Sequence, residues 1–257
     1  MTALRIVTFG IFGLAFGSFL TVVDYRAPRR AALVGGRSRC PSCGATISAR
    51  DNVPVLSYLV LRGRCRRCRT PISPKYPLVE LATAALFVAA AVAFGDVYVA
   101  GVIAVFLGAM VALAIIDIEH RLIPNVVVYP SLALFLVAIA VGALLGRPVS
   151  VTGAGLGLLV FGGAILIVAL LSPRGMGMGD VKLASLIGLV LGSQGLRYVA
   201  VAAGLAIVAG GVGGIVALAL GRSRKDTIPF GPYLAAGSIA AAFFAGPIAG
   251  AYLSLLR

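Results

Sequence analysis

Long apolar stretches recur from one end of the chain to the other, and they constrain its fold more than any other feature. About 20 consecutive apolar residues suffice to cross a bilayer as a helix. Hydrophobic residues make up 60% of the 257 positions, against roughly half in soluble domains. We therefore predict an all-α polytopic membrane protein with about eight transmembrane helices. The stretches, of which the second is at the lower length limit and the sixth is short, are residues 3–23, 78–94, 97–116, 126–145, 149–171, 181–193, 196–220 and 233–256.

Basic residues set the predicted orientation of these helices, because Lys and Arg concentrate in cytoplasmic loops. The net charge of +14 is therefore interpreted as membrane topology, and not as a sign of nucleic-acid binding. The segment 24–77 carries the largest group: Arg26, Arg29, Arg30, Arg37, Arg39, Arg50, Arg62, Arg64, Arg66, Arg67, Arg69 and Lys75. The loops predicted on the same side add Arg121, Arg174, Lys182, Arg222, Arg224 and Lys225. We predict that this side is cytoplasmic and that both termini lie outside.

All four cysteines lie in the segment 24–77, as two C-x2-C pairs separated by 21 residues. Two such pairs can surround one zinc ion with four thiolates, and the cytoplasm keeps thiols reduced, which disfavours disulfides. We predict a structural Zn²⁺ in a zinc-ribbon-like loop; free or redox-active thiols are the alternative. Four protein ligands leave no open coordination position, so this zinc would stabilise the loop and would not react with a substrate. The predicted ligands are Cys40, Cys43, Cys65 and Cys68.

Two of the eight acidic residues stand beside apolar stretches on the predicted cytoplasmic side: Asp117 in AIIDIEHRLIPN and Asp180 in GMGMGDVKL. Two carboxyl groups held close together rarely ionise at the same time, so one keeps its proton. The ionised one can activate water while the protonated one polarises a peptide carbonyl, which is aspartyl-protease chemistry. Nearby glycines would let a substrate approach the backbone, whereas Lys182 would anchor the helix at the headgroups or bias the local charge. These glycines are Gly175, Gly177 and Gly179.

Other interpretations of the same residues remain open. Asp180 alone could cap a helix N-terminus. A proton-coupled membrane transporter could use Asp117 and Asp180 as proton carriers, although such sites tend toward mid-bilayer and often accompany repeated halves. A zinc-bearing membrane scaffold without chemistry is a third possibility. We interpret His120 as a helix-end residue, and the following acids as ordinary solvated or interfacial positions: Asp24, Asp51, Glu80, Asp96 and Asp226.

Several separated motifs resemble, in order, those of the bacterial type IV prepilin peptidases. This is a leader peptidase and N-methyltransferase family of membrane aspartyl proteases with a Gly-x-Gly-Asp motif. The resemblance covers nearly the whole chain. The matching stretches are FGLAFGSFLTVVDYR (12–26), CPSC (40–43), NVPVLSYLVLRGRC (52–65), CRRC (65–68), YPLVE (76–80), IDIEHRLIPN (116–125), GMGDVKL (177–183) and IPFGPYLAAG (228–237).

The resemblance implies that Asp117 and Asp180 are the catalytic pair. It also implies that the enzyme cuts the short basic leader of prepilins or pseudopilins, from type IV pilus or secretion systems, at the cytoplasmic face of the bacterial inner membrane. Many long members also methylate the new N-terminus with S-adenosylmethionine, and the cysteine loop suggests this longer form. Ala84 stands where methylating members often have glycine, which weakens the methyltransferase assignment, and Asn125 stands where aspartate is frequent.

We predict a division of the chain into three parts. Residues 1–23 form a first transmembrane helix, which lacks a clear Ala-x-Ala cleavage site and is therefore interpreted as retained. Residues 24–77 form the cytoplasmic zinc-binding loop with the four cysteines, and residues 78–257 form a transmembrane aspartyl peptidase domain. The expected partners are prepilin or pseudopilin substrates and membrane lipid, without nucleic acid.

Overall fold

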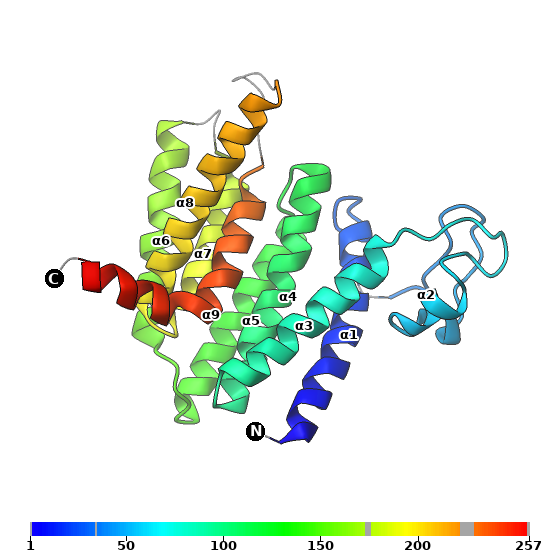
Figure 1. Ribbon diagram of the computed structural model, residues 1–257, viewed down its shortest axis with the longest axis horizontal. Helices are drawn as coiled ribbons and strands as arrows, with labels where there is room; N and C mark the ends of the chain where they lie inside the picture. Colours follow the sequence, from blue (N-terminus) through cyan, green and yellow to red (C-terminus); the bar gives the residue numbers. More distant parts are fainter. Residues whose placement is uncertain (1, 34, 173–175, 222–228, 256–257) are drawn as a thin grey trace.

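A computed structural model describes residues 2–33, 35–172, 176–221 and 229–255 of the chain (Figure 1). Within those ranges the structure is helical, and strand-like pairing is limited to two isolated bridges. The helices are α1 (Ala3–Arg26), η1 (Ala49–Asn52), α2 (Leu56–Val60), α3 (Lys75–Ala93), α4 (Val97–His120), α5 (Asn125–Leu144), α6 (Val151–Leu171), α7 (Met178–Gly192), α8 (Leu196–Ala219) and α9 (Gly231–Leu255). Several residues named above lie outside the described ranges: Arg174, Gly175, Arg222, Arg224, Lys225 and Asp226.

Seven of these helices, α1, α3, α4, α5, α6, α8 and α9, are long and apolar enough to cross a membrane. This confirms the predicted all-α polytopic architecture. The short sixth stretch forms α7, whose 15 residues span about 22 Å at the usual rise per residue. That length falls short of a bilayer core of roughly 30 Å. Most residues of α7 are buried, so this helix is enclosed by the bundle and has little contact with lipid.

Glycines bring α6 and α7 into backbone contact. A side chain at Gly157 would collide with the carbonyl oxygen of Gly188, and a side chain at Gly192 would collide with that of Gly153. Helices in lipid associate mainly through close van der Waals packing, which small residues permit. The glycine contact therefore fixes α7, and with it the acid at its start, inside the bundle.

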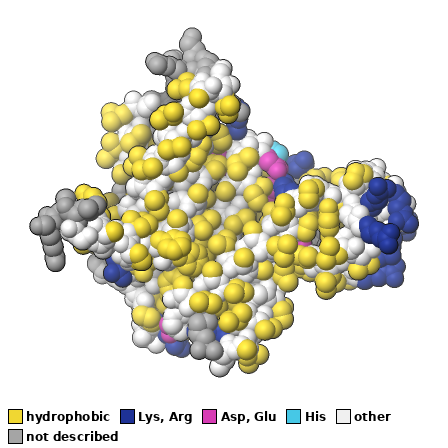
Figure 2. All heavy atoms as spheres, viewed as in Figure 1, with side chains coloured by type: hydrophobic (Ala, Val, Ile, Leu, Met, Phe, Trp, Pro, Cys, Tyr) yellow, Lys and Arg dark blue, Asp and Glu magenta, His cyan; other side chains and the backbone are white. Residues whose placement is uncertain are grey.

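The helix α4 forms the other centre of the core. Ile103, Phe106, Leu107, Met110 and Leu113 on this helix are fully buried. In Figure 1, α1 and α3 lie together on one side of α4, while α6, α7 and α8 lie on the other side beyond α9. Hydrophobic side chains cover most of the visible bundle surface, and basic side chains gather at the end of the loop that joins α1 to α3 (Figure 2). This distribution is typical of a bundle surrounded by lipid.

Asp96 lies directly before the first residue of α4 and has a structural role. It caps α4 by accepting a hydrogen bond from the Val99 N–H, at 3.0 Å, and it pairs with Arg147 at 3.3 Å. Both interactions favour the ionised carboxylate and lower the pKa of Asp96. The prediction of an ordinary interfacial acid is therefore consistent with the structure at this position.

Candidate active site and metal centre

Asp117 lies in the last turn of α4 and is 5% exposed. Its Oδ2 accepts a hydrogen bond from the backbone N–H of Gly231, at 3.1 Å. Gly231 is the first residue of α9, so the carboxyl group of Asp117 sits at the N-terminus of that helix, where the helix dipole favours negative charge. A side chain at Gly231 would place its Cβ 2.5 Å from Asp117 Oδ2. Only glycine fits this contact without a shift of the helix or the acid.

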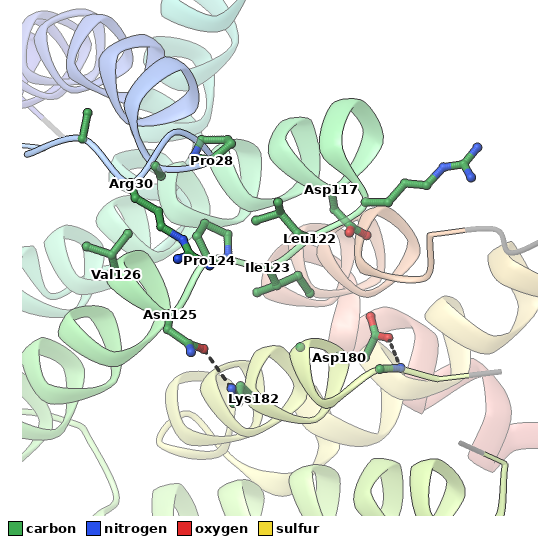
Figure 3. Close-up of a pocket in the computed structure, with 15 residues that line it drawn as sticks. Pro28, Arg30, Asp117, Leu122, Ile123, Pro124, Asn125, Val126, Asp180 and Lys182 are labelled. Carbon is green, nitrogen blue, oxygen red and sulfur yellow. Dashed lines mark hydrogen bonds between the residues drawn. The ribbon is translucent and has the colours of Figure 1, made fainter. Parts of the chain in front are cut away.

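Asp180 lies in the first turn of α7, where its Oδ2 accepts a hydrogen bond from the Gly177 N–H at 3.1 Å. This contact is the carboxylate half of a capping box, and it confirms that Asp180 caps its own helix. The cap is only part of its environment, however, because Asp180 also lines the cavity that contains Asp117. Figure 3 shows the two side chains pointing toward one another from α4 and α7. The structure thus brings the two predicted catalytic acids together.

The cavity between the two acids has a volume of about 770 Å³. Its walls come from three separate segments: the turn after α1, the linker from α4 to α5, and the start of α7. Basic side chains line it beside the acids, including Arg30 and Arg121. A space of this size can hold several residues of an extended peptide beside two carboxyl groups.

The remaining residues of the GMGDVK stretch shape one wall of the cavity. Gly179 lets Ile123 approach closely, because a Cβ at this position would lie 3.1 Å from the Ile123 Cβ. Lys182 donates a hydrogen bond to Asn125 Oδ1 at 2.8 Å, and its Nζ lies 5.3 Å from the centre of the Tyr129 ring. Figure 3 shows this contact directed toward the start of α5 and away from the carboxyl groups. Lys182 therefore ties α7 to α5 across the cavity.

Sequence reasoning missed two residues of this site. From the sequence, Asn125 stands out only as a departure from the family pattern, yet its Oδ1 accepts a hydrogen bond from Lys182. Gly231 holds Asp117 from a distance of 114 positions in the chain, and the only signal for it was its place within the IPFGPYLAAG stretch. His120, by contrast, ends α4 as an exposed residue and does not line the cavity, in agreement with its interpretation as a helix-end residue.

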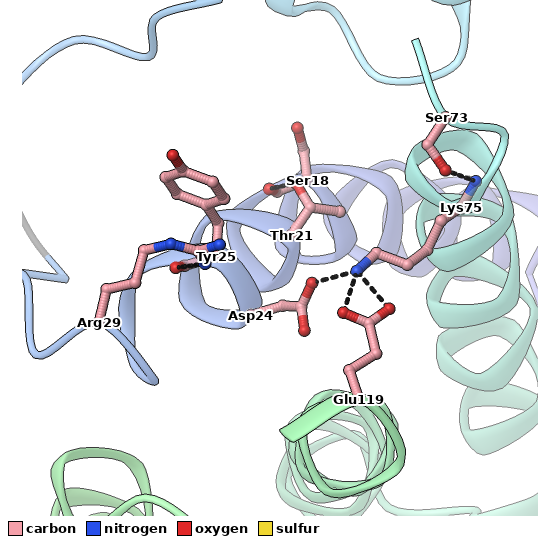
Figure 4. Close-up of polar contacts among 8 residues, drawn as sticks. All are labelled: Ser18, Thr21, Asp24, Tyr25, Arg29, Ser73, Lys75 and Glu119. Carbon is pink, nitrogen blue, oxygen red and sulfur yellow. Dashed lines mark hydrogen bonds and ion pairs between the residues drawn. The ribbon is translucent and has the colours of Figure 1, made fainter. Parts of the chain in front are cut away.

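An ion cluster braces the end of α4 that carries Asp117 (Figure 4). Lys75 at the start of α3 donates to Asp24 Oδ2 of α1 at 2.6 Å and to Glu119 of α4 at 2.8 and 2.9 Å. Asp24 is only 6% exposed and Glu80 only 7%. Of the predicted solvated or interfacial positions, the solvated alternative is therefore wrong for these two acids. Asp24 is buried because it pairs with Lys75, and Glu80 because it accepts a hydrogen bond from the Val55 N–H at 2.7 Å.

The four cysteines converge in the loop between α1 and α3, with all their sulfurs within 4.8 Å of one another. The Sγ atoms of Cys40 and Cys68 are 3.8 Å apart. Sulfurs bound about 2.3 Å from a tetrahedral zinc would be separated by roughly 3.8 Å. The donor set and its spacing therefore fit one zinc ion, as the two C-x2-C pairs predicted.

The two cysteine pairs sit on turns of the same design. In each, the N–H of the fourth residue after the first cysteine donates to the carbonyl of that cysteine: Gly44 to Cys40 at 2.9 Å and Arg69 to Cys65 at 3.0 Å. Gly44 and Arg69 both have a positive φ, of 70° and 60°. The hydroxyl and N–H of Thr70 lower the pKa of Cys68 to about 6. At Cys68, hydrogen bonds from the hydroxyl and backbone of Thr70 thus favour the thiolate form.

Comparison with known proteins shows which family the chain belongs to. Residues 11–94 match the bacterial peptidase A24 N-terminal domain, and residues 104–218 match the type IV leader peptidase family. The chain is 37% identical, over 92% of its length, to a prepilin leader peptidase/N-methyltransferase of Burkholderia pseudomallei, and covers 84% of that protein. It is 33% identical, over 95% of its length, to the Bacillus subtilis protein of the same name, and covers 96% of it. The chain belongs to the type IV leader peptidase family.

A third relative in the family, the prepilin leader peptidase/N-methyltransferase of Pseudomonas aeruginosa, is 35% identical over 95% of the chain and is covered to 91%. No solved structure matches the chain. Membership of the type IV leader peptidase family favours a peptidase over a proton-coupled transporter or an inert scaffold. The two family matches also include both candidate sites, because the first contains all four cysteines and the second contains Asp117 and Asp180.

Proposed function

We propose that this chain is an aspartic endopeptidase that removes the leader of prepilins or pseudopilins, with Asp117 and Asp180 as its catalytic pair. The observation that carries the proposal is the convergence of these two carboxyl groups on one cavity, from helices that are far apart in the sequence (Figure 3). The names of the relatives supply the substrate class. The basic side chains Arg30 and Arg121 at the cavity would contact the substrate backbone or its carbonyl groups.

The chemistry requires one protonated and one ionised carboxyl group. The ionised carboxylate takes a proton from a water molecule as that water attacks the scissile carbonyl carbon, and the protonated acid donates to the carbonyl oxygen. In the resulting tetrahedral intermediate the C–N bond breaks, and the amine leaves with the proton that the first carboxylate took from water. The second carboxylate takes its proton back from a hydroxyl group of the intermediate as the carbonyl re-forms. Gly231 and Gly177 each donate a backbone N–H to one acid and so fix the two carboxyl groups in position.

The proposed orientation places this cavity at the cytoplasmic face of the bacterial inner membrane. The arginine-rich segment 24–77 leaves and rejoins the bundle at Asp24 and Lys75, and Lys75 binds Glu119, two residues from Asp117. The cavity and the basic loop are therefore at the same end of the bundle. The proposed parts of the chain are a first helix (1–23), the four-cysteine loop (24–77) and the peptidase domain (78–257), with a structural Zn²⁺ held by the four cysteines.

We also propose that the enzyme methylates the new N-terminus with S-adenosylmethionine, because the relatives are named as N-methyltransferases. Ala84, the residue that departs from the pattern of methylating members, packs against α1. A Cβ at Gly13 would lie 2.6 Å from the Ala84 Cα. Ala84 is thus part of the α1–α3 contact.

Mass spectrometry of the N-terminus of a co-expressed prepilin tests both activities, because it reports cleavage, its position and methylation in one measurement. Asp117→Asn and Asp180→Asn should each abolish cleavage, because neither asparagine can transfer the required proton. Asp96→Asn, at the opposite end of α4, is the matched control and should cleave normally. Complete cleavage by either variant of the catalytic pair would overturn the assignment of these residues.

A further inference from the structure

The short helix α2 in the four-cysteine loop exposes apolar side chains that the chain itself does not cover. Leu56, Leu59 and Val60 are 61%, 63% and 74% exposed, and Val53 just before the helix is 41% exposed. α2 lies outside the membrane-spanning helices, so lipid around the bundle does not account for this exposure by itself. Three large apolar side chains grouped on one short helix, with a fourth just before it, indicate a contact surface.

Unpaired arginines follow this helix directly. Arg62, Arg64, Arg67 and Arg69 are all exposed, and among the described residues none of them makes an ion pair. Arg66, between them, is the exception because it pairs with Asp51. Figure 2 shows the basic side chains gathered at the end of the loop. The exposed apolar helix is therefore followed directly in the chain by unpaired cations.

The position of the loop determines what can reach this surface. Both ends of the loop are continuous with membrane-spanning helices, α1 and α3, so the loop stays close to the bilayer at all times. Figure 1 shows that it projects sideways from α1 and α3 and does not cover the end of the bundle. The Glu80 carboxylate on α3 holds the start of α2 through the Val55 N–H. The loop therefore extends over the lipid that surrounds the bundle, with α2 fixed to a spanning helix.

We propose that α2 and the four arginines form a membrane-docking surface, which we define as Leu56, Leu59, Val60, Arg62, Arg64, Arg67 and Arg69. Its apolar side chains insert into the interfacial layer and its guanidinium groups bind anionic phospholipid headgroups. Amphipathic segments that combine apolar and basic side chains bind membranes by burying apolar area and by attraction to anionic lipids. Lipid is a better candidate ligand for this surface than a protein partner, because the connections of the loop to α1 and α3 already hold it at the bilayer. The proposal does not depend on the enzymatic activity.

The chain contains no tryptophan, so a single substitution provides an unambiguous fluorescent reporter. Leu59→Trp would be reconstituted into nanodiscs of phosphatidylcholine, with and without phosphatidylglycerol, using brominated lipids as quenchers. Val60→Trp on the same helix serves as a second reporter in case the first disturbs the loop. Leu134→Trp, on the exposed side of α5, gives the quenching of a residue in contact with lipid.

We expect brominated lipid to quench Leu59→Trp to at least half the extent seen for Leu134→Trp, and phosphatidylglycerol to increase that quenching. Replacing the four arginines by glutamine should remove the increase, whereas Arg197→Gln at the opposite end of the bundle should leave it unchanged. Solvent-like emission without quenching at both reporter positions would overturn the proposal. So would a change in emission that requires added prepilin and occurs equally in both lipids, because the surface would then bind protein.

Discussion

The four-cysteine loop and the aspartate cavity are assembled in opposite ways. The loop draws its four sulfurs from one continuous segment, residues 40–68, through two turns of the same design. The cavity draws its acids from α4 and α7, and Asp117 is held by Gly231 from 114 positions away. Two of the four cysteines are exposed, whereas Asp117 is 5% exposed inside the bundle.

This contrast implies that the two sites depend on different forces. A small loop with few buried side chains would depend on the proposed zinc for stability. The cavity depends on helix packing, above all on the close contacts of α6 with α7 and of α9 with Asp117. Changes in one site should therefore leave the other largely intact, except where a residue joins them.

The largest expected effect is the loss of the metal from the loop. Cys40→Ser removes one of the four ligands. Because structural zinc binding is worth roughly 10–16 kcal/mol at neutral pH, we expect this variant to lose its zinc and its loop to become sensitive to protease. The cavity does not contain the loop cysteines, so cleavage should persist. Elemental analysis, limited proteolysis and the N-terminal mass assay measure the three outcomes.

Ser42→Ala, between two of the ligands, is the matched control and should keep its zinc. One result would contradict the zinc assignment and another the separation of the sites. One is a wild-type protein purified without bound metal, which would favour free thiols. The other is complete loss of cleavage in Cys40→Ser while the helical bundle melts at the wild-type temperature.

Gly231→Ala, at the cavity, should have the opposite effect to Cys40→Ser: cleavage should fall while the zinc is retained. Its Cβ would lie 2.5 Å from Asp117 Oδ2, so α9 or the carboxyl group must shift. A misplacement near 1 Å can cost about 100-fold in rate, and we expect a loss of that order in kcat with zinc content unchanged. Gly250→Ala, on the same helix with open space around it, is the control. If Gly231→Ala cleaves at the wild-type rate, the glycine does not position the acid.

Lys75 joins the two sites, so its replacement should affect both of them moderately. Lys75→Met leaves the buried Asp24 carboxylate without its ammonium partner. Breaking a fully buried pair costs about 3–5 kcal/mol. Because the Lys75 side chain is 29% exposed, we expect a smaller loss, about 1–2 kcal/mol in the free energy of unfolding after solvent screening. Thermal melting in detergent measures it.

The double variant Lys75→Met, Asp24→Asn provides the internal control for this prediction. Removing the stranded charge should recover much of the lost stability, because the neutral amide has a lower burial cost than the carboxylate. If the double variant melts no higher than Lys75→Met alone, the loss arises from packing of the lysine stem and not from the ion cluster.

The same contrast explains how much could be predicted from the sequence. The four-cysteine cluster could be predicted residue by residue, because its members follow a local spacing. The helices could also be predicted from apolar runs, although α4 continues to His120 and so includes Asp117, beyond the predicted end at residue 116. Asp117 and Asp180 stood out because acids are rare in such a chain.

The features that could not be predicted all depend on contacts between distant segments. The pairing of Asp24 with Lys75 connects residues 51 positions apart, and no charge count shows which cation meets which acid. The burial of α7 follows from glycines on α6 that match glycines on α7 in register. The hydrogen bond from Gly231 to Asp117 requires the first residue of α9 to lie beside that one carboxyl group. Each of these is a result of packing, which a single sequence does not specify locally.

The smallest expected effect concerns the ion pair of Asp51 with Arg66 in the loop, at 2.6 Å. The Arg66 guanidinium lowers the pKa of Asp51. The pair therefore contributes stability above the usual aspartate pKa of about 3.9, and that contribution disappears as the pH falls through the lower value in the folded loop. Exposed ion pairs contribute little to stability because solvent screens them, so Asp51→Asn should slightly increase hydrogen exchange of the loop amides at pH 7, to the same extent between pH 6 and 8. Added salt should reduce the difference from wild type, because it screens the pair. Asp51 is part of the loop only, so cleavage should not change; a fall in cleavage with Asp51→Asn would show that the loop and the cavity are coupled by more than Lys75.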